Sequence, residues 1–490
     1  MTQIYTKQLI KRFQNPKFVK SLKNPDGVGE IGNVACGDVM HLEIKVKDRK
    51  IEDIGFKTFG CLPPDEKINL NNSWIEISNV SKSDKVLNGK GKEVKVVDTY
   101  RGKFNGELLE IVPFVSRFNS FYVTPLHPIC CIKRKFLPSS RKSSNKCKWF
   151  RVSKKDLETC RHCFVEADYL EKGDYLIFPK IKKHKNNRRF SKSIMRLLGY
   201  YLSEGYTSAN NSVLAFAFHK NEEKYIKEIS RLIKIIIKKD AKIRVRNNVT
   251  EVYVCSRKWV KFFLVHGNKI AKRKEISEEI MLLPFKKQWE MIKTYINGDG
   301  NLYKRRKSDT PTYRISTASE KLAIQIQRIL ARGDIFASIK KYKRAETKIE
   351  GKTLKASIFY EVSFKRKKSH RFVKETGNFF FVPIREINKK RFKGYVHNLE
   401  VGGKEHSYLA KGFSVHNCGA AIASSDVVCE LAKGKTLEEA KKLTKDDIVK
   451  KLGGMPPIKV HCSVLGIQAL KKAIEDYETK RKKKNYAQTS

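Results

Sequence analysis

The chain changes character at the bond between Asn417 and Cys418, inside the stretch KGFSVHNCGAAIASS, and no linker separates the two parts. The sequence before this bond has the alternating pattern of short strands, whereas the sequence after it has a helical pattern. The outer segments, 1–60 and 418–490, hold 26 basic and 16 acidic residues and so carry +10, which leaves +42 of the net +52 for residues 61–417. A chain with this break is expected to form several domains.

The composition indicates which kind of partner and which cellular compartment to expect. The positive excess of residues 61–417 indicates a polyanionic partner, most simply nucleic acid, although general lysine enrichment is an alternative. No apolar run approaches the ~20 residues of a membrane span, and the N-terminus lacks the hydrophobic region of a signal peptide. We therefore expect a cytoplasmic protein with no membrane partner. Its eleven cysteines are then expected to be thiols, metal ligands or nucleophiles rather than disulfides.

The two outer segments have the patterns of a small α+β domain. Residues 5–18 have an amphipathic helical pattern, and two alternating runs after them predict a β-hairpin that turns at residues 47–50. Beyond Cys418 the chain is helical, and Thr436 with Glu439 forms the pattern of a capping box. We expect a small antiparallel sheet packed against helices.

Joining Gly60 directly to Cys418 brings three motifs into one 133-residue sequence: A-C-G-D, G-C-G-x-x-I-A-S-S and P-P-x-K-x-H-C-S. Along nearly its whole length this sequence resembles the iron–sulfur cluster assembly scaffolds of the IscU/NifU N-terminal type. The resemblance implies that a transient iron–sulfur cluster, or iron or zinc, is bound by Cys36, Asp38, Cys418, His461 and Cys462. Thiolates are soft ligands suited to these metals. Any one of these cysteines alone would be interpreted as an ordinary buried residue, and Cys429 is interpreted in that way.

The same resemblance implies protein partners: a cysteine desulfurase, acceptor apoproteins and a DnaK-type chaperone. The chaperone would bind the segment MPPIK at 455–459, where Met455 replaces the usual Leu. We expect a helix to start at Ser463, so that its N-terminus stabilises the Cys462 thiolate. A zinc-binding module that assembles no cluster is the alternative.

Residues 61–417 begin with Cys61, end in VHN before Cys418, and contain TPLHPI at 124–129 and VHNLEVGGKEHSYLAKGFSVHN at their end. Short strand patterns such as EVKVVDTY (93–100) and ELLEIVPF (107–114) lie between. This ordered set resembles a protein-splicing element, an intein, and implies an all-β splicing domain of the Hedgehog/intein type.

The intein resemblance also implies roles for single residues, and no cofactor. Cys61 would attack the Gly60 carbonyl with help from Thr124 and His127, Cys418 would take over the acyl group, and Asn417 would cyclise with His406 and His416 as proton-transfer partners. Asn398 stands where this family commonly has Asp or Cys. Because Asn cannot act as a base, the substitution predicts slower splicing or a different use of this position.

An internal repeat lies within the middle segment. LLGYYLSEGY (197–206) and MIKTYINGDGN (291–301) are each a hydrophobic helix pattern ending in an acidic residue and Gly, followed by strands and an amphipathic helix. The copies resemble the two LAGLIDADG motifs of homing endonucleases, an α/β two-repeat fold that cuts double-stranded DNA. The resemblance implies that Glu204 and Asp299 hold Mg²⁺ and that Lys274 is a catalytic lysine. The alternative is two helices closed by Gly C-caps.

The resemblances divide the chain at fixed points. Residues 1–60 and 418–490 are expected to form the scaffold, 61–183 and 377–417 the splicing domain, and 184–376 the endonuclease. The expected function is a precursor that excises 61–417 and joins Gly60 to Cys418. A stand-alone DNA endonuclease with interaction arms is the alternative.

The pair Cys160 and Cys163 is left over from these assignments. Its C-x₂-C spacing could hold Zn²⁺, with the upstream Cys130, Cys131 and Cys147 as further thiols, and ordinary loop cysteines are the alternative.

Overall fold

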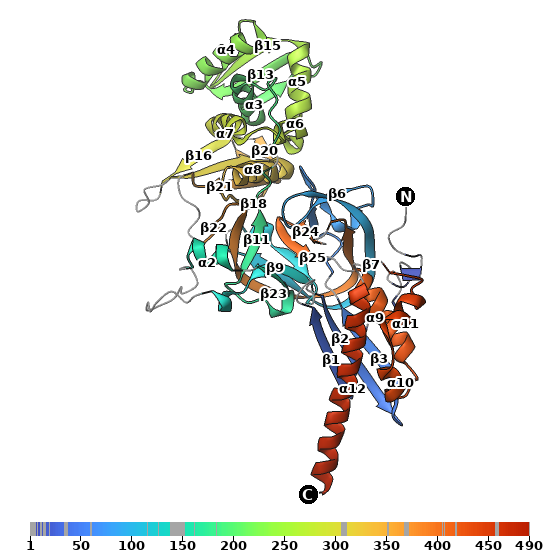
Figure 1. The fold of residues 1–490 in the computed structure, drawn as a ribbon. Coiled ribbons are helices and arrows are strands. Elements are labelled where there is room, and N and C mark those ends of the chain that lie inside the picture. The colour runs from blue at the N-terminus through green and yellow to red at the C-terminus, as the bar shows by residue number, and fades with distance from the viewer. Residues whose placement is uncertain are drawn as a thin grey trace, which may run out of the picture.

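The protein is mixed α/β and multidomain, as expected from the sequence (Figure 1). The computed structural model describes residues 6–489 except for 7, 10–11, 13–15, 19, 34–37, 59–60, 115, 126, 138–151, 161, 183, 305–310, 350–351, 367–371, 404, 406, 417–418 and 456–459. In Figure 1 a two-repeat unit lies at the top, a large sheet in the middle, and the unit made of the two ends of the chain at the bottom. Each of the three has its own apolar core.

The outer unit, built from residues before 59 and after 418, has one antiparallel sheet in the order β1-β2-β3. Its elements are β1 (Gly27–Asn33), β2 (Asp38–Lys47), β3 (Lys50–Thr58), α9 (Gly419–Ala432), α10 (Leu437–Lys441), α11 (Lys445–Lys451) and α12 (Val460–Thr489). Met40 and Ile54 from the first segment share a core with Val427 and Leu470 from the second. The two ends of the chain therefore fold together although 357 residues separate them.

Two local predictions for the outer unit are confirmed and one is wrong. The hairpin turns at Asp48 and Arg49, whose φ values of 47° and 57° form the left-handed two-residue turn that suits twisted strands. Thr436 and Glu439 form the capping box before α10. The last helix, however, begins at Val460 rather than Ser463. Ser463 is completely buried within the helix and does not cap it. The predicted helix over 5–18 lies largely outside the described residues.

The central sheet combines residues from both sides of the two-repeat unit, and the described residues supply twelve strands to it. They are β4 (Lys67–Asn69), β5 (Trp74–Glu76), β6 (Lys85–Leu87), β7 (Glu93–Pro113), β8 (Phe121–Val123), β9 (Pro128–Ile132), β10 (Cys163–Glu166), β11 (Tyr175–Pro179), β22 (Lys374–Glu375), β23 (Phe379–Val401), β24 (Ser407–Ala410) and β25 (Phe413–His416). The main strand order is β5-β4-β24-β25-β9-β11-β23-β7-β6, so the hairpin β24–β25 inserts between β4 and β9.

The strand patterns at 93–100 and 107–114 form one continuous strand, β7, where the sequence suggested two. The reason is its antiparallel partner β23, which pairs with it from Ile384 to Val401 and supplies hydrogen bonds across the polar middle. A short helix, α2 (Lys154–Thr159), lies outside the sheet, and η2 (Arg117–Asn119) connects β7 to β8.

The two-repeat unit confirms the internal repeat. Each copy has a long helix, a four-stranded antiparallel sheet and an amphipathic helix. The helices are α3 (Lys192–Glu204), α4 (Glu223–Ile237), α5 (Arg257–Gly267), α6 (Glu278–Met281), α7 (Phe285–Asp299) and α8 (Glu320–Arg332). The sheets are β12 (Gly205–Thr207), β13 (Val213–His219), β15 (Val249–Cys255), β14 (Lys242–Arg246), and β16 (Gly300–Tyr303), β17 (Thr312–Thr317), β21 (Ser357–Phe364), β18 (Ser338–Arg344). Among the helices of the described residues, none is both long enough and apolar enough to cross a bilayer.

Candidate functional site

Cys61 is fixed between β3 and the central sheet by hydrogen bonds to Thr124. The N–H of Cys61 donates to Thr124 Oγ1 at 2.7 Å, and the N–H of Thr124 donates to the Cys61 carbonyl at 2.9 Å. The next residue, Leu62, exchanges backbone hydrogen bonds of 2.8 and 2.7 Å with His397 of β23. Because the nitrogen of Cys61 belongs to the Gly60–Cys61 peptide bond, the Thr124 hydroxyl contacts that bond directly.

Thr124 and His127 lie on the tight turn between β8 and β9. Thr124 is 5% exposed and His127 is completely buried. The N–H of His127 donates to the Thr124 carbonyl at 3.0 Å, and the His127 carbonyl accepts from the N–H of Ala167 at 3.0 Å. These backbone hydrogen bonds fix the turn, so Thr124 and His127 are held in a set arrangement beside Cys61.

The C-terminal end of the same segment reaches this turn through β25. Val415 of β25 pairs with Ile129 of β9, two residues after His127. His416, the last residue of β25, is 4% exposed, and its ring lies edge-on against Phe164, with 4.7 Å between the centroids. The structure thus brings Cys61, Thr124, His127 and His416 to one region, whereas His406, Asn417 and Cys418 lie outside the described residues.

Sequence reasoning missed Tyr408, which is completely buried in β24 beside this region. Its hydroxyl donates to Asn398 Oδ1 at 2.9 Å, and the N–H of Leu399 donates to the same oxygen at 2.8 Å. Burial, and then the nearby Cys61 thiol, raises the pKa of Tyr408 well above its ordinary value. In the sequence Tyr408 is only one residue of a strand pattern, so nothing marked it as a polar contact of Asn398.

The Cys61 thiol is held in its neutral form. Part of the residue's surface is exposed, but the protein atoms around the sulfur raise the pKa of the thiol to about 12 by desolvation. At neutral pH the thiol is therefore protonated in this conformation, and a nucleophilic role requires that its proton be removed.

A second site is formed where α3 and α7 end. Gly199 of α3 lies directly against Thr294 and Met291 of α7, where any side chain would collide, so the two helices pack closely. Their last residues are Glu204 and Asp299. The pKa of Glu204 is raised to about 7, by burial first and then by the charge of Asp299, and burial raises the pKa of Asp299 to about 6. By surface exposure Glu204 is half-buried and Asp299 is exposed. Two neighbouring carboxylates are a donor set that fits a divalent cation with oxygen ligands.

Lys274 is buried beside the carboxylates, at the C-terminal end of α3. Its Nζ donates to the Gly205 carbonyl at 2.8 Å and to the Tyr201 carbonyl, and lies 4.6 Å from the centre of the Tyr201 ring. Burial lowers the pKa of Lys274 to about 8, and the charges of Asp299 and Glu204 oppose that shift. The lysine ammonium thus stabilises both the helix end and the two acids.

Gly205 and Gly300 are the C-cap residues of α3 and α7, as the alternative interpretation of the repeat had it, but they are not in the left-handed conformation. Their φ values are −87° and −108°, an extended conformation open to any residue. Glycine is needed for space instead, because a side chain at Gly205 would strike Tyr201 and one at Gly300 would strike Ile296.

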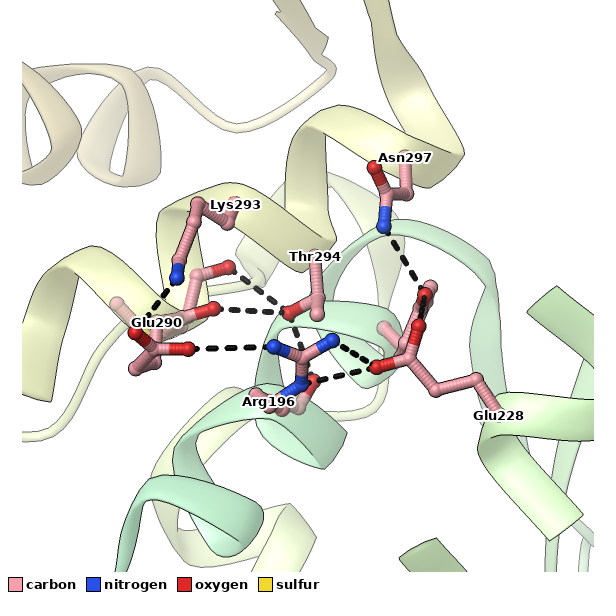
Figure 2. A network of polar contacts seen from close by, with 8 residues as sticks. Arg196, Glu228, Glu290, Lys293, Thr294 and Asn297 are labelled. Atoms are coloured by element: carbon pink, nitrogen blue, oxygen red, sulfur yellow. Dashed lines mark hydrogen bonds and ion pairs between the residues drawn. The ribbon is translucent and has the colours of Figure 1, made fainter. Parts of the chain in front are cut away.

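A polar network joins α3 and α7 to each other and to α4 (Figure 2). The Arg196 guanidinium of α3 bridges Glu228 of α4, at 2.9 Å from its Nε, and Glu290 of α7, at 3.3 Å. Thr294 Oγ1 donates to the Arg196 carbonyl at 2.7 Å. In the same network Asn297 Nδ2 donates to the Tyr200 hydroxyl at 3.0 Å. The network fixes the distance between the helices that end in Glu204 and Asp299.

The predicted cluster ligands cannot be placed. Cys36 and Cys418 lie outside the described residues, as do the side chains of Asp38, His461 and Cys462. Cys429 is completely buried in the core of the outer unit, as its apolar surroundings in the sequence suggested.

The described residues contain no group of three or more His, Cys, Asp or Glu arranged to hold a metal ion. Cys163 of β10 lies opposite Cys131 of β9, and Cys160 ends α2. Cys147 lies outside the described residues. A zinc site at Cys160 and Cys163 therefore stays a prediction.

Comparison with known families identifies two parts of the chain. Residues 4–64 and 399–484 match the NifU-like N-terminal domain, and residues 286–377 match the LAGLIDADG-like domain. The chain carries a NifU-like N-terminal domain split around a LAGLIDADG-like domain. The NifU-like match includes the outer unit, and the LAGLIDADG-like match covers the second repeat with α7 and Asp299.

Among curated proteins, the scaffold protein IscU of Rickettsia prowazekii is 48% identical over 86 residues, which are 18% of this chain and 64% of that protein. The SufBD family protein Rv1461 of Mycobacterium tuberculosis, named for iron–sulfur cluster assembly, is 28% identical over 374 residues, 75% of this chain and 44% of its own length. The helicase Hel308 of Thermococcus kodakarensis is 26% identical over 414 residues, 73% of this chain and 36% of its own length. This chain thus spans less than half of either longer relative.

Among solved structures, the homing endonuclease I-DmoI in complex with DNA and calcium covers 35% of this chain and 82% of its own, at 15% identity and a TM-score of 0.25. This score is too low to support an argument from the likeness.

Proposed function

We propose that the chain is a precursor that excises residues 61–417 by autocatalytic splicing and joins Gly60 to Cys418. In this proposal residues 61–183 and 377–417 form a splicing domain, 184–376 an endonuclease, and the joined outer segments an iron–sulfur scaffold. One observation carries it: the Thr124 hydroxyl lies 2.7 Å from the nitrogen of the Gly60–Cys61 bond, the bond to be broken. β25, which leads to Asn417, ends at the same turn.

The first step would exchange an amide for a thioester. The Cys61 sulfur attacks the Gly60 carbonyl carbon, the carbon–nitrogen bond breaks, and the nitrogen of Cys61 leaves as an amine that has gained a proton. Thr124 and His127 would hold the scissile amide and supply that proton. Because the Cys61 thiol is neutral with a pKa of about 12, its own proton must be transferred as the sulfur attacks.

The remaining steps conserve all atoms. The Cys418 thiolate attacks the Gly60 thioester and releases the Cys61 thiol. The side-chain amide nitrogen of Asn417 then attacks its own carbonyl carbon, which closes a succinimide ring and frees the amine of Cys418, with His416 and His406 as proton-transfer partners. Finally that amine attacks the thioester, so that a peptide bond joins Gly60 to Cys418 and the thiol is restored. No oxidant, reductant or cofactor is consumed.

The relatives support an element that occurs in different host proteins. Rv1461 and Hel308 each match about three quarters of this chain, and the outer segments hold only 133 of its 490 residues. Both matches must therefore include most of residues 61–417. One of these proteins is named as an iron–sulfur cluster assembly protein and the other as a DNA helicase. Hosts of such different kinds are expected if the middle segment can be inserted into unrelated genes.

The spliced product would be a scaffold on which iron–sulfur clusters are assembled and passed on. Cys36, Asp38, Cys418, His461 and Cys462 would be its ligands, with iron and sulfide as cargo. A cysteine desulfurase, a DnaK-type chaperone at 455–459 and acceptor apoproteins would be its partners. The identity of 48% to an IscU scaffold supports this assignment.

The LAGLIDADG-like domain would cleave double-stranded DNA. Glu204 and Asp299 would hold Mg²⁺, which when bound supplies a Lewis acid for phosphodiester hydrolysis. Lys274 would stabilise charge beside the two acids. The positive charge of +42 in residues 61–417 suits contacts to DNA phosphates.

The splicing proposal is tested by expressing the full 490-residue chain and measuring the masses of its products. We expect species of 357 and 133 residues. Cys61→Ala and Asn417→Ala should each prevent the 133-residue product. A chain that stays intact over a range of temperatures and thiol concentrations would contradict splicing and favour a stand-alone endonuclease.

The scaffold proposal has a separate test. The purified 133-residue product is incubated anaerobically with ferrous iron and sulfide, and the visible absorption of a bound cluster is recorded. Zinc binding without any cluster would favour the plain zinc-binding module. The Cys61→Ala precursor is the matched comparison, because it keeps Cys36 and Cys418 on opposite sides of the insert.

A further inference from the structure

The turn of the last hairpin before the splice junction is fixed by distant side chains. β24 and β25 are joined by Lys411 and Gly412, whose φ values of 43° and 98° give a left-handed two-residue turn. The N–H of Gly412 donates to Asn69 Oδ1 at 2.8 Å. Because β25 runs directly from this turn to His416, the turn sets the position of the strand that leads to Asn417.

One of the fixing contacts comes from Asn119, which is 1% exposed at the end of η2. Its Nδ2 donates to the Lys411 carbonyl at 2.8 Å and to Gln327 Oε1 at 3.5 Å, and its Oδ1 accepts from Nε2 of Gln327 at 3.2 Å. Gln327, 2% exposed, belongs to α8 of the LAGLIDADG-like domain, and its Nε2 also donates to the Ala337 carbonyl at 2.7 Å. A helix of the inserted domain therefore contacts the hairpin turn through the buried amide of Asn119.

Gln327 determines which way the Asn119 amide points. An Asn side chain has a donor end and an acceptor end, and turning it by 180° exchanges them. Only Nδ2 can donate to the Lys411 carbonyl, and the turned amide would place oxygen against oxygen. Gln327 Nε2, anchored by Ala337, offers a hydrogen that only Asn119 Oδ1 can accept. The glutamine thus selects the orientation that supports the turn.

We propose that Gln327 is a positioning residue for splicing, acting through Asn119 on the β24–β25 turn and so on the C-terminal splice junction. This inference rests on the proposed splicing activity. A neighbouring contact points the same way: Arg328 of α8, 6% exposed, donates to the Leu70 carbonyl at 2.6 Å on the loop between β4 and β5. In this proposal helix α8 helps to position the residues that splice, so the inserted domain contributes to splicing.

The chain contains a matched control on the same helix. Gln325 is completely buried, two residues before Gln327. Its Nε2 donates to the Ile276 carbonyl at 2.7 Å, and its Oε1 accepts from the N–H of Ile276 at 2.7 Å. Both bonds stay within the two-repeat unit. Substitution of either glutamine removes a buried amide from α8, but only Gln327 is bonded to Asn119.

The experiment separates the two ends of the reaction in full-length precursors. In a Cys61→Ala background, release of residues 418–490 reports Asn417 cyclisation alone. In an Asn417→Ala background, release of residues 1–60 by dithiothreitol reports thioester formation at Cys61 alone. Gln327→Ala, Gln327→Glu, Gln325→Ala and Gln325→Glu are compared in both backgrounds, and circular dichroism melting checks that each variant folds.

We expect Gln327→Ala to slow release of 418–490 by about tenfold and to change thiol-induced release of 1–60 by less than about twofold. Gln327→Glu, of the same shape but without the donor, should be slowed as much. Both Gln325 variants should stay within about twofold of their parents. Equal effects of the Gln325 and Gln327 variants, or equal loss at both ends, would overturn the positioning role. Absence of any cleavage in the parent chain would instead overturn splicing itself, and the inference with it.

Discussion

The proposed splice junction and the ends of the helix pair hold their reactive groups in opposite charge states. At the junction Cys61 is neutral, because desolvation raises the pKa of its thiol from 9.0 to about 12. At the ends of α3 and α7, Glu204 and Asp299 have pKa values raised to about 7 and about 6, so both become fully charged only above neutral pH. The second site therefore holds up to two negative charges near neutral pH, which the Lys274 ammonium offsets in part.

This difference determines which site lowers the stability of the fold. A pKa raised by folding means that the folded state binds protons the unfolded chain has already released, so stability falls as pH rises between the two values. For Glu204 that window runs from 4.5 to about 7, and for Cys61 from 9.0 to about 12. The carboxylates therefore weaken the metal-free fold at neutral pH, whereas the thiol does not. A bound cation would remove that weakness.

The largest expected effect is at the carboxylate pair. Glu204→Gln should reduce DNA cleavage by about a hundredfold or more, because a ligand for Mg²⁺ is lost. The same change should raise the melting temperature of the metal-free protein at about pH 8 by roughly 2–4 °C, and this gain should shrink as pH falls towards 4.5, where the acid is protonated. Scanning calorimetry in EDTA at both pH values measures the gain.

The control for this prediction is Glu223→Gln, which removes an exposed carboxylate paired with Lys227 at 2.9 Å. It should affect neither cleavage nor the pH dependence of melting. A Glu204→Gln variant that is less stable in the same alkaline buffer would show that the carboxylates do not weaken the fold.

At the proposed splice junction we expect the hydrogen bond to Thr124 to affect the reaction rate more strongly than the charge of any group does. Thr124→Ala removes the hydroxyl 2.7 Å from the scissile nitrogen and should slow thiol-induced release of residues 1–60 by about a hundredfold. Thr124→Ser should keep most of the rate. The control is Ser120→Ala, whose hydroxyl donates to Glu110 at 3.0 Å, away from Cys61. Equal rates for Thr124→Ala and Ser120→Ala would exclude a role for the threonine.

The outer unit contains a buried carboxylate that, unlike the pair at the ends of α3 and α7, accepts hydrogen bonds from several donors. Asp426 of α9 is completely buried and accepts from the N–H groups of Lys17 and Phe18, at 2.6 and 2.9 Å, and from Arg12 at 2.9 Å. Here both carboxylate oxygens accept hydrogen bonds within the fold. Asp426→Asn should lower the local unfolding free energy by about 2–3 kcal/mol.

Hydrogen–deuterium exchange of the full chain measures this loss as faster exchange in α9 and β3. The exposed Asp446 provides the control, Asp446→Asn, which should leave exchange unchanged. Unchanged exchange in Asp426→Asn would contradict the prediction that a carboxylate with its own donors stabilises the fold, unlike the pair at the ends of α3 and α7.

Local signals were enough to predict several features of the molecule. The hairpin at 47–50, the capping box at Thr436 and the two helices ending in Glu204 and Asp299 each depend on residues within a few positions of one another. The nearness of Cys61 and Thr124 was implied by a family resemblance, and the structure supplies the contact between them.

Long-range contacts between polar side chains could not be predicted in this way. Gln327 and Asn119 are 208 positions apart, and Gln325 has the same residue type, helix and burial but different partners. In the sequence Tyr408 is an ordinary strand residue. Its hydrogen bond to Asn398 exists only because β24 and β23 meet in the folded chain. The continuity of β7 depends on its partner β23, which no local pattern contains. Such features depend on which distant segments meet in the folded chain.

The smallest expected effect is at Asn398, where the sequence predicted slower splicing because Asn cannot act as a base. In the structure Asn398 Oδ1 accepts from the Tyr408 hydroxyl at 2.9 Å and from the N–H of Leu399 at 2.8 Å. Aspartate offers the same acceptor, so Asn398→Asp should keep both bonds and change the splicing rate by less than about threefold. Asn398→Leu, which fills the space without an acceptor, should leave the buried Tyr408 hydroxyl unsatisfied and slow splicing by about tenfold or more. Following the spliced product over time measures both variants. If Asn398→Asp accelerated splicing by about a hundredfold, a missing base rather than a hydrogen-bond acceptor would define this position, and the neutral character of the splice junction would be lost.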